Sequence, residues 1–111
     1  MTKDYMVYLE DIIKSCELIA KYTQEITKKE FEENTDKQDS VIRRLEIIGE
    51  AIKRLPMDFR EKHPEIAWKK AAGMRDMLIH AYDEVKVDQV WDTVINVLPS
   101  FNQQIKNLLE E

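Results

Sequence analysis

Residues 73–84, GMRDMLIHAYDE, bring four polar side chains within eight positions: Arg75, Asp76, His80 and Tyr82. An arginine offers a fork of N–H donors to phosphate oxygens, and a histidine can move protons near neutral pH. On a helix, Arg75 and His80 are separated by roughly 7.5 Å of axial rise, which a long arginine side chain can span. The pair therefore suits chemistry at a phosphodiester.

Asp76 and His80 are four residues apart, so they are neighbours on a helix surface. The carboxylate can orient the imidazole and favour its protonated form, and the last turn of a helix favours a cation as well. A structural alternative stays open, in which Arg75 pairs with a glutamate of a neighbouring helix and His80 caps its own. Tyr82 can equally pack on the apolar row with its hydroxyl at the rim.

The elements that position these residues are predicted to be helices. With 111 residues, 43% of them hydrophobic, the chain suits one domain over 1–111 with a small core. An apolar stripe predicts a first helix over about residues 4–30. It consists of Tyr5, Tyr8, Leu9, Ile12, Ile13, Cys16, Ile19, Ala20, Thr23 and Ile26.

Thr35 and Gln38 fit a capping box that starts a second helix, and Pro56 ends it. Its narrow seam is Val41, Leu45, Ile48, Ile52 and Leu55, a spacing typical of aligned helix packing. Residues 56–66 are expected to form a connector with a short helical turn. His63 precedes Pro64 and is therefore expected in a loop, without a functional role.

A third helix is predicted over about residues 67–82, with Trp68, Ala71, Ala72, Ile79 and Tyr82 on one side and Arg75 in the middle of that row. A fourth should cover about residues 88–110 and bend at Pro99. The fold class is thus all-α: an antiparallel bundle of four main helices plus a short connecting helix.

Composition excludes several classes of protein. Cys16 is the only cysteine, so a disulfide framework and a cysteine zinc site are excluded, and the residue is expected to be core. No apolar run approaches the ~20 residues that span a membrane, and the N-terminus lacks a signal-peptide core. We expect a cytoplasmic protein without a membrane association, a metal or another cofactor.

The stretch resembles the R-x4-H-x-Y motif of HepT-like toxins in the HEPN superfamily, through Arg75, His80 and Tyr82. The flanking segments VIRRLEIIGEAIKRL, IAWKKAAGMRDMLIHAYDEV and VWDTVINVLPSF agree, so the resemblance covers nearly the whole chain. One departure is Ala67, where many relatives have proline before the tryptophan. That difference affects the start of the helix more than its chemistry.

The resemblance implies a helical, dimeric, metal-independent ribonuclease that is the toxin of a type VII toxin–antitoxin module. Arg75 and His80 would be catalytic, with Asp76 as the polar residue that commonly follows the arginine. The implied partner is a MntA-like nucleotidyltransferase antitoxin, which would use ATP to attach AMP to Tyr82. The rival hypothesis is a non-catalytic helical adaptor or regulatory subunit of a nucleotidyltransferase.

The net charge of −5 requires that any RNA contact come from a local basic patch. Six residues could supply contacts to phosphate, although each could also be part of a solvated helix surface. They are Arg43, Arg44, Lys53, Arg54, Lys69 and Lys70.

Overall fold

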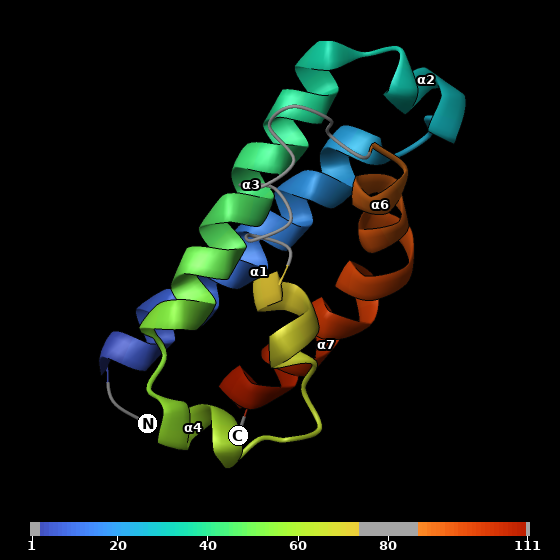
Figure 1. The fold of residues 1–111 in the computed structure, drawn as a ribbon. Helices are drawn as coiled ribbons and strands as arrows, with labels where there is room; N and C mark the ends of the chain where they lie inside the picture. The colour runs from blue at the N-terminus through green and yellow to red at the C-terminus, as the bar shows by residue number, and fades with distance from the viewer. Residues whose placement is uncertain (1–2, 74–86, 111) are drawn as a thin grey trace.

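The structure is a computed structural model that describes residues 3–73 and 87–110. These residues form helices, and no strand occurs among them, which confirms the all-α expectation (Figure 1). Residues 68–73 are also helical. The remaining elements are α1 (Lys3–Thr23), α2 (Lys28–Glu32), α3 (Thr35–Arg54), α4 (Met57–Glu61), α6 (Val87–Asp92), the π-helical η1 (Thr93–Val97) and α7 (Leu98–Glu110).

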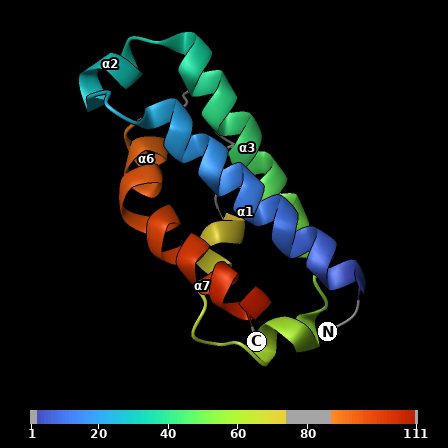
Figure 2. The same cartoon turned by 180° about the vertical axis from the view of Figure 1, so that it is seen from behind.

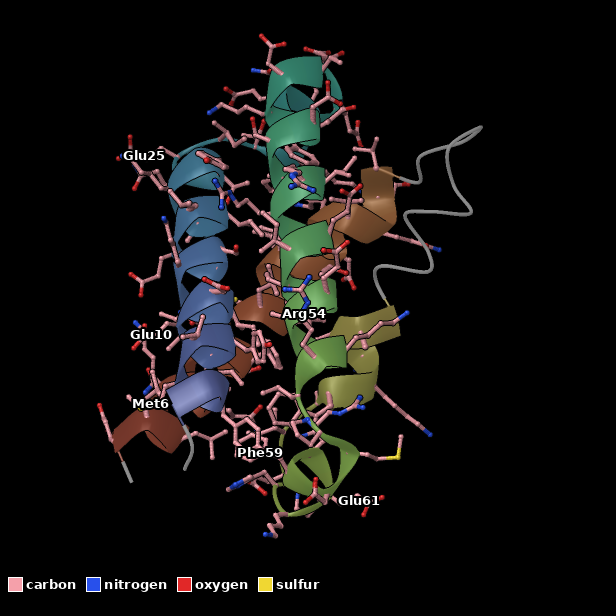
Figure 3. The ribbon with its side chains drawn as sticks, turned by 90° about the vertical axis from the view of Figure 1, so that its left-hand side faces the viewer. Met6, Glu10, Glu25, Arg54, Phe59 and Glu61 are labelled. Atoms are coloured by element: carbon pink, nitrogen blue, oxygen red, sulfur yellow. The ribbon has the colours of Figure 1, made fainter. Side chains whose placement is uncertain are left out.

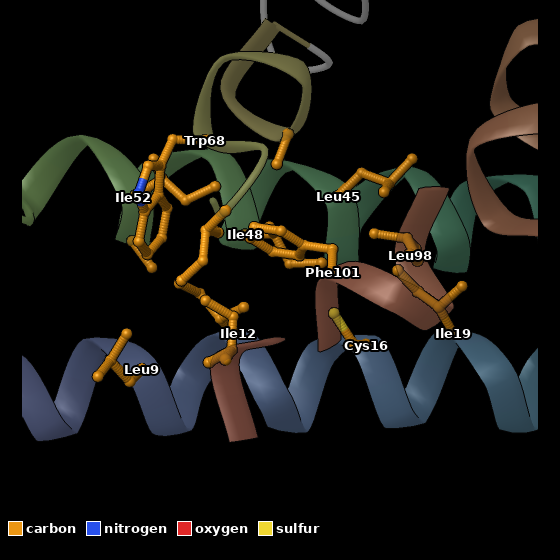
Figure 4. Packing of buried hydrophobic residues seen from close by; sticks show 14 of the residues in the cluster. Leu9, Ile12, Cys16, Ile19, Leu45, Ile48, Ile52, Trp68, Leu98 and Phe101 are labelled. Carbon is orange, nitrogen blue, oxygen red and sulfur yellow. The ribbon is translucent and has the colours of Figure 1, made fainter. Parts of the chain in front are cut away.

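The core lies along the antiparallel pair of α1 and α3, which run side by side over most of their length (Figure 1). The predicted seam of α3 is buried throughout, and Leu9, Ile12 and Ile19 of α1 face it with at most 1% of their surface exposed (Figure 4). Ala20, predicted on the α1 stripe, is exposed instead, whereas Ser15 is buried. The buried face of α1 therefore includes Ser15 and leaves out Ala20, which differs slightly from the predicted stripe.

The first helix is shorter than predicted, because α1 ends at Thr23. Glu25 has a φ of 63°, a left-handed conformation that a right-handed helix cannot contain. A separate helix, α2, then begins after Thr27. The Thr27 hydroxyl accepts a hydrogen bond from the Glu30 N–H (3.1 Å) and the Glu30 carboxylate accepts one from the Thr27 N–H (3.2 Å). This capping box was the sequence signal for α2.

The capping box predicted for Thr35 and Gln38 is wrong. Asn34 caps α3, and its side-chain oxygen accepts a hydrogen bond from the Lys37 N–H at 3.0 Å. Gln38 donates from its amide to the carbonyls of Phe31 and Glu32, both at 2.9 Å. Its side chain thus donates to carbonyls at the end of α2 instead of capping the start of its own helix.

Residues 87–110 form one continuous helical run that bends, as predicted, near Pro99 (Figure 2). Proline has no N–H to donate, so the regular i→i−4 ladder is interrupted there. The preceding turn is π-helical, and the Leu98 N–H donates to the Thr93 carbonyl five residues back. Trp68 lies between this run and α3, and it contacts Phe101 of α7 (Figure 4).

The two ends of the described chain lie near each other, close to α4 (Figures 1 and 2). As predicted, α3 stops before Pro56 and a short helix, α4, occupies the connector. Across residues 3–73 and 87–110, no helix is long and apolar enough to cross a membrane.

Truncation of Ile48 tests the α1–α3 core. Ile48 is fully buried, whereas Ile95 of η1 is 48% exposed. We expect Ile48→Ala to lower the free energy of unfolding by about 2–5 kcal/mol, because it removes buried surface and leaves a cavity. The matched change Ile95→Ala should cost much less. Urea unfolding followed by circular dichroism, at one fixed protein concentration, compares the two; equal losses would contradict this placement of the core.

Candidate functional site

The four motif residues, Arg75, Asp76, His80 and Tyr82, lie in the segment 74–86, outside the described residues. Their mutual arrangement therefore stays a prediction from the sequence. The chain is described up to Gly73 on one side and from Val87 on the other. The structure thus informs the site through the elements that hold these two flanks.

Trp68 anchors the N-terminal flank of the motif. Only 7% of its surface is exposed, and its indole N–H donates to the carbonyl of His63 at 3.0 Å. Its ring meets that of Phe101 edge-on, with centroids 6.1 Å apart, a favourable geometry for an aromatic pair. One turn further on, Ala71 is fully buried. The helical residues 68–73 are consequently fixed against the core, as their predicted apolar row required.

The connector before Trp68 is tied down as well. His63 lies outside any helix, as predicted, and its ring contacts that of Phe59 at a centroid distance of 5.1 Å. Its Nδ1 is 3.6 Å from the Glu65 carboxylate. The Gln104 side-chain amide of α7 donates to the Glu65 carbonyl at 2.9 Å. These contacts give His63 a structural role.

The C-terminal flank of the motif is held by α2, the helix absent from the sequence prediction. Phe31 is fully buried and lies against Trp91 of α6, with ring centroids 5.2 Å apart. Lys28 and Asp88 form an exposed ion pair at 3.2 Å between the same two helices. Aromatic packing therefore holds α6 against α2, and the ion pair adds little because both partners are solvated.

A basic hollow adjoins the N-terminal flank. It has a volume of about 460 Å³ and lies where the end of α3, α4 and residues 68–73 meet. Figure 3 shows this face, with Arg54, Phe59 and Glu61 labelled. Its charged lining consists of Lys53, Arg60, Lys69 and Glu61. Arg60 was not among the basic residues singled out in the sequence, since a lone arginine in a connector carries no signal.

A second hollow, of about 410 Å³, lies on the other side of Gly73. Its charged residues are Lys70 of the helical residues 68–73 with Asp88 and Asp92 of α6. Asp88 is paired with Lys28, and the lining also holds Asp92 beside Lys70, so this hollow has no excess of positive charge for a phosphate. Gly73 lines both hollows, so two surfaces of opposite charge flank the point where the motif segment begins.

The structure brings together only part of the predicted basic patch. Lys53 and Lys69 share the basic hollow, whereas Lys70 lines the acidic one. Arg43 is exposed and paired with Glu46 of the same helix at 3.4 Å. Arg44 is half-buried and Arg54 is exposed, and neither lines the basic hollow among its described residues. Helix geometry alone does not distinguish these positions, because their neighbours belong to other elements.

A metal site and a reactive thiol are two further possibilities for the described residues. Within the described part of the chain, no group of three or more histidine, cysteine, aspartate and glutamate side chains could hold a metal ion. Cys16 is 4% exposed, as its predicted core position required. Burial, and to a smaller extent the charge of Glu17, raise the pKa of the Cys16 thiol to about 12. A protonated, buried thiol is a poor nucleophile.

Comparisons of the chain with a family model and with known proteins agree on one family. The family model described as "Ribonuclease HepT-like" matches residues 12–108. The "Probable ribonuclease HepT" of Thermococcus cleftensis is 46% identical over 108 residues, which cover 97% of this chain and 98% of the relative. The "Putative RNase" of Caldanaerobacter subterraneus subsp. tengcongensis is 40% identical over 104 residues, covering 94% of this chain and 93% of the relative.

A third relative is a longer protein. The "Gamma-glutamylcyclotransferase and putative RNase" of Methanocaldococcus jannaschii is 47% identical over 111 residues, and this chain spans 50% of its length. No solved structure significantly matches the chain.

The state of Cys16 can be tested with a thiol reagent. Because the folded pKa is raised from 9.0 to about 12, the native thiol should react with Ellman's reagent at pH 8 far more slowly than in 8 M urea. The unfolded chain loses the thiol proton at a lower pH than the folded chain does. The contribution of Cys16 to the free energy of unfolding should therefore be complete below pH 9.0 and fall as the pH rises toward about 12. Equal reactivity in native and unfolded protein would show that the thiol is exposed.

Proposed function

Because the chain belongs to the HepT-like ribonuclease family, we propose that it is the toxin of a type VII toxin–antitoxin module and cleaves RNA internally without a metal ion. The observation that supports this proposal most directly is the motif Arg75-x4-His80-x-Tyr82 inside a family match that spans residues 12–108. We place the activity in the cytoplasm and in a single domain over residues 1–111.

The proposed active site is composite and forms in a homodimer. One histidine cannot easily act as base and acid in the same cleavage, whereas a two-fold axis brings two copies of His80 and Arg75 to one cleft. One His80 takes the proton from the ribose 2′-hydroxyl, whose oxygen attacks the adjacent phosphorus. The other His80 protonates the 5′-oxygen as the phosphorus–oxygen bond breaks, which leaves a 2′,3′-cyclic phosphate and a 5′-hydroxyl.

The remaining motif residues support this reaction. The two Arg75 guanidinium groups stabilise the charge that develops on the phosphorane. Asp76, four residues before His80 in the sequence, orients the imidazole and favours its protonated form. The flanks of the motif are held by Trp68 and by α2 against α6, and such support on both sides suits a site that needs fixed geometry.

Control of the toxin is proposed to act on Tyr82. A cognate MntA-like nucleotidyltransferase binds ATP with Mg²⁺, and the Tyr82 hydroxyl attacks the α-phosphorus. The hydroxyl loses its proton, an AMP–tyrosine phosphodiester forms, and pyrophosphate leaves. Asp83 and Glu84 follow directly, so the added phosphate joins existing negative charge and repels RNA.

Replacement of the two histidines distinguishes catalysis from structure. In EDTA, the purified protein should cleave total RNA, and His80→Ala should lose about 10²–10⁴-fold of the rate because a proton-transfer group is missing. His63→Ala is the matched control, since His63 lies in the connector, and it should retain cleavage. Light scattering should give about twice the chain mass of 13.2 kDa for all three proteins.

Cleavage by His80→Ala at the wild-type rate would contradict the catalytic assignment, and a strict monomer at micromolar concentration would contradict the composite site. If the wild-type chain neither cleaves RNA nor arrests growth when expressed alone, the non-catalytic adaptor becomes the better hypothesis.

Replacement of the tyrosine tests the control mechanism. Tyr82→Phe should keep substantial cleavage, because its hydroxyl transfers no proton in the reaction, yet it should resist silencing by the nucleotidyltransferase with ATP and Mg²⁺. Tyr22→Phe, on α1, is the control and should still be silenced. Intact mass spectrometry would show additions of AMP, and peptide fragmentation would locate them. Modification at Tyr5, Tyr8 or Tyr22 would refute this mechanism.

A further inference from the structure

We propose that the basic hollow between the end of α3, α4 and residues 68–73 holds the backbone of the RNA substrate beside the bond that is cleaved. Its phosphate contacts are Arg60 and Lys69. The inference rests on the proposed ribonuclease function and extends it by assigning a substrate-binding surface outside the motif.

The charge of the hollow is the first argument. Arg60 and Lys69 line the hollow together with a single carboxylate, that of Glu61. Neither Arg60 nor Lys69 has an ion-pair partner within residues 3–73 and 87–110. In a chain with a net charge of −5, such a local excess of cations attracts a polyanion to one place.

The hydrogen bonding of Arg60 is the second argument. Its Nε is buried and has no hydrogen-bond partner within the described structure. A buried N–H without an acceptor is unfavourable, because it has lost its hydrogen bonds to water. Arg60 lines the hollow, so its guanidinium can turn toward a phosphate there and give this N–H an acceptor, and the fork of an arginine suits two phosphate oxygens.

The rest of the lining favours a nucleic acid over an acidic peptide. Met57 lines the hollow with 65% of its surface exposed, so it offers a polarizable apolar surface to a nucleobase beside the phosphate contacts. Gly73 closes the hollow, two residues before Arg75 in the sequence. A strand that lies along the hollow is therefore led toward the start of the motif and away from the acidic hollow beyond Gly73.

The experiment measures binding apart from cleavage. A fluorescent single-stranded 2′-O-methyl RNA has no free 2′-hydroxyl and cannot be cleaved by the proposed reaction. Its affinity for the full chain is measured by anisotropy over a range of salt concentrations, for wild type, Lys69→Gln and Arg60→Gln/Lys69→Gln. The control is Lys14→Gln/Lys21→Gln, which removes the same charge from a different hollow on α1.

We expect the Arg60→Gln/Lys69→Gln variant to lose about tenfold or more in affinity. The slope of log affinity against log salt should become shallower by about 0.7 for each lost phosphate contact, so by about 1.4 in this variant and about 0.7 in Lys69→Gln. The control should bind like wild type. Lys69 is exposed, so Lys69→Gln tests the proposal even if the Arg60 change destabilises the fold.

If neither Lys69→Gln nor Arg60→Gln/Lys69→Gln changes the affinity for RNA or its salt dependence, the proposal is overturned. An equal loss of affinity in the control would overturn it too. Failure of wild type to bind the RNA would also overturn it. If the hollow variants bind RNA normally but no longer bind the nucleotidyltransferase, the proposal is overturned as well, and the hollow is assigned to a protein partner. His80→Ala separates the two proposals. It removes the proposed proton-transfer group, so its cleavage rate tests the active site, whereas the Arg60 and Lys69 variants test binding to an RNA that cannot be cleaved.

Discussion

The packing of α1 against α3 is the constraint on which the rest of the fold depends. Both helices present a stripe of large aliphatic side chains, and neither stripe can be satisfied by its own helix. Once Leu45 and Ile48 face Ile12 and Ile19 in an antiparallel pair, the remaining helices have one shared surface to cover. The run from α6 to α7 and the indole of Trp68 complete that cover through contacts with this pair.

The two flanks of the motif are supported in different ways. Trp68 is held by a hydrogen bond to the His63 carbonyl and by an aromatic contact with Phe101, so the N-terminal flank is tied to a connector and to α7. The start of α6 is held by Phe31 of α2 against Trp91. Both supports rely mainly on buried rings, which resist displacement because interiors are close-packed. The proposed chemistry thus has a rigid frame on both sides.

Basic and acidic side chains line separate hollows, so the negative net charge of the chain does not exclude a local contact with RNA. The two hollows that meet at Gly73 have opposite character, one lined by Arg60 and Lys69 and the other by Asp88 and Asp92. Charges that lie closer than a Debye length, about 8 Å at physiological salt, act on a ligand more strongly than the net charge does. The proposed path of a phosphate backbone therefore lies on the side of Gly73 that carries Arg60 and Lys69.

The sequence by itself determined the helical class, the buried seam of α3, its end before Pro56 and the bend near Pro99, because these depend on periodicity and on the missing proline N–H. It also carried the motif on which the active-site proposal rests. The break after Thr23 escaped prediction because Glu25 adopts its left-handed conformation without the glycine that usually marks one.

Only the tertiary structure decided which residues meet across elements. Gln38 fits a capping box in the sequence, yet its side-chain amide donates hydrogen bonds to α2, because the carbonyls of Phe31 and Glu32 lie within its reach. Six basic residues looked equivalent in the sequence, but only Lys53 and Lys69 share a hollow with Arg60. The physical reason is that a helical pattern determines which face a residue occupies, whereas the partner of that face depends on how segments distant in the chain pack together.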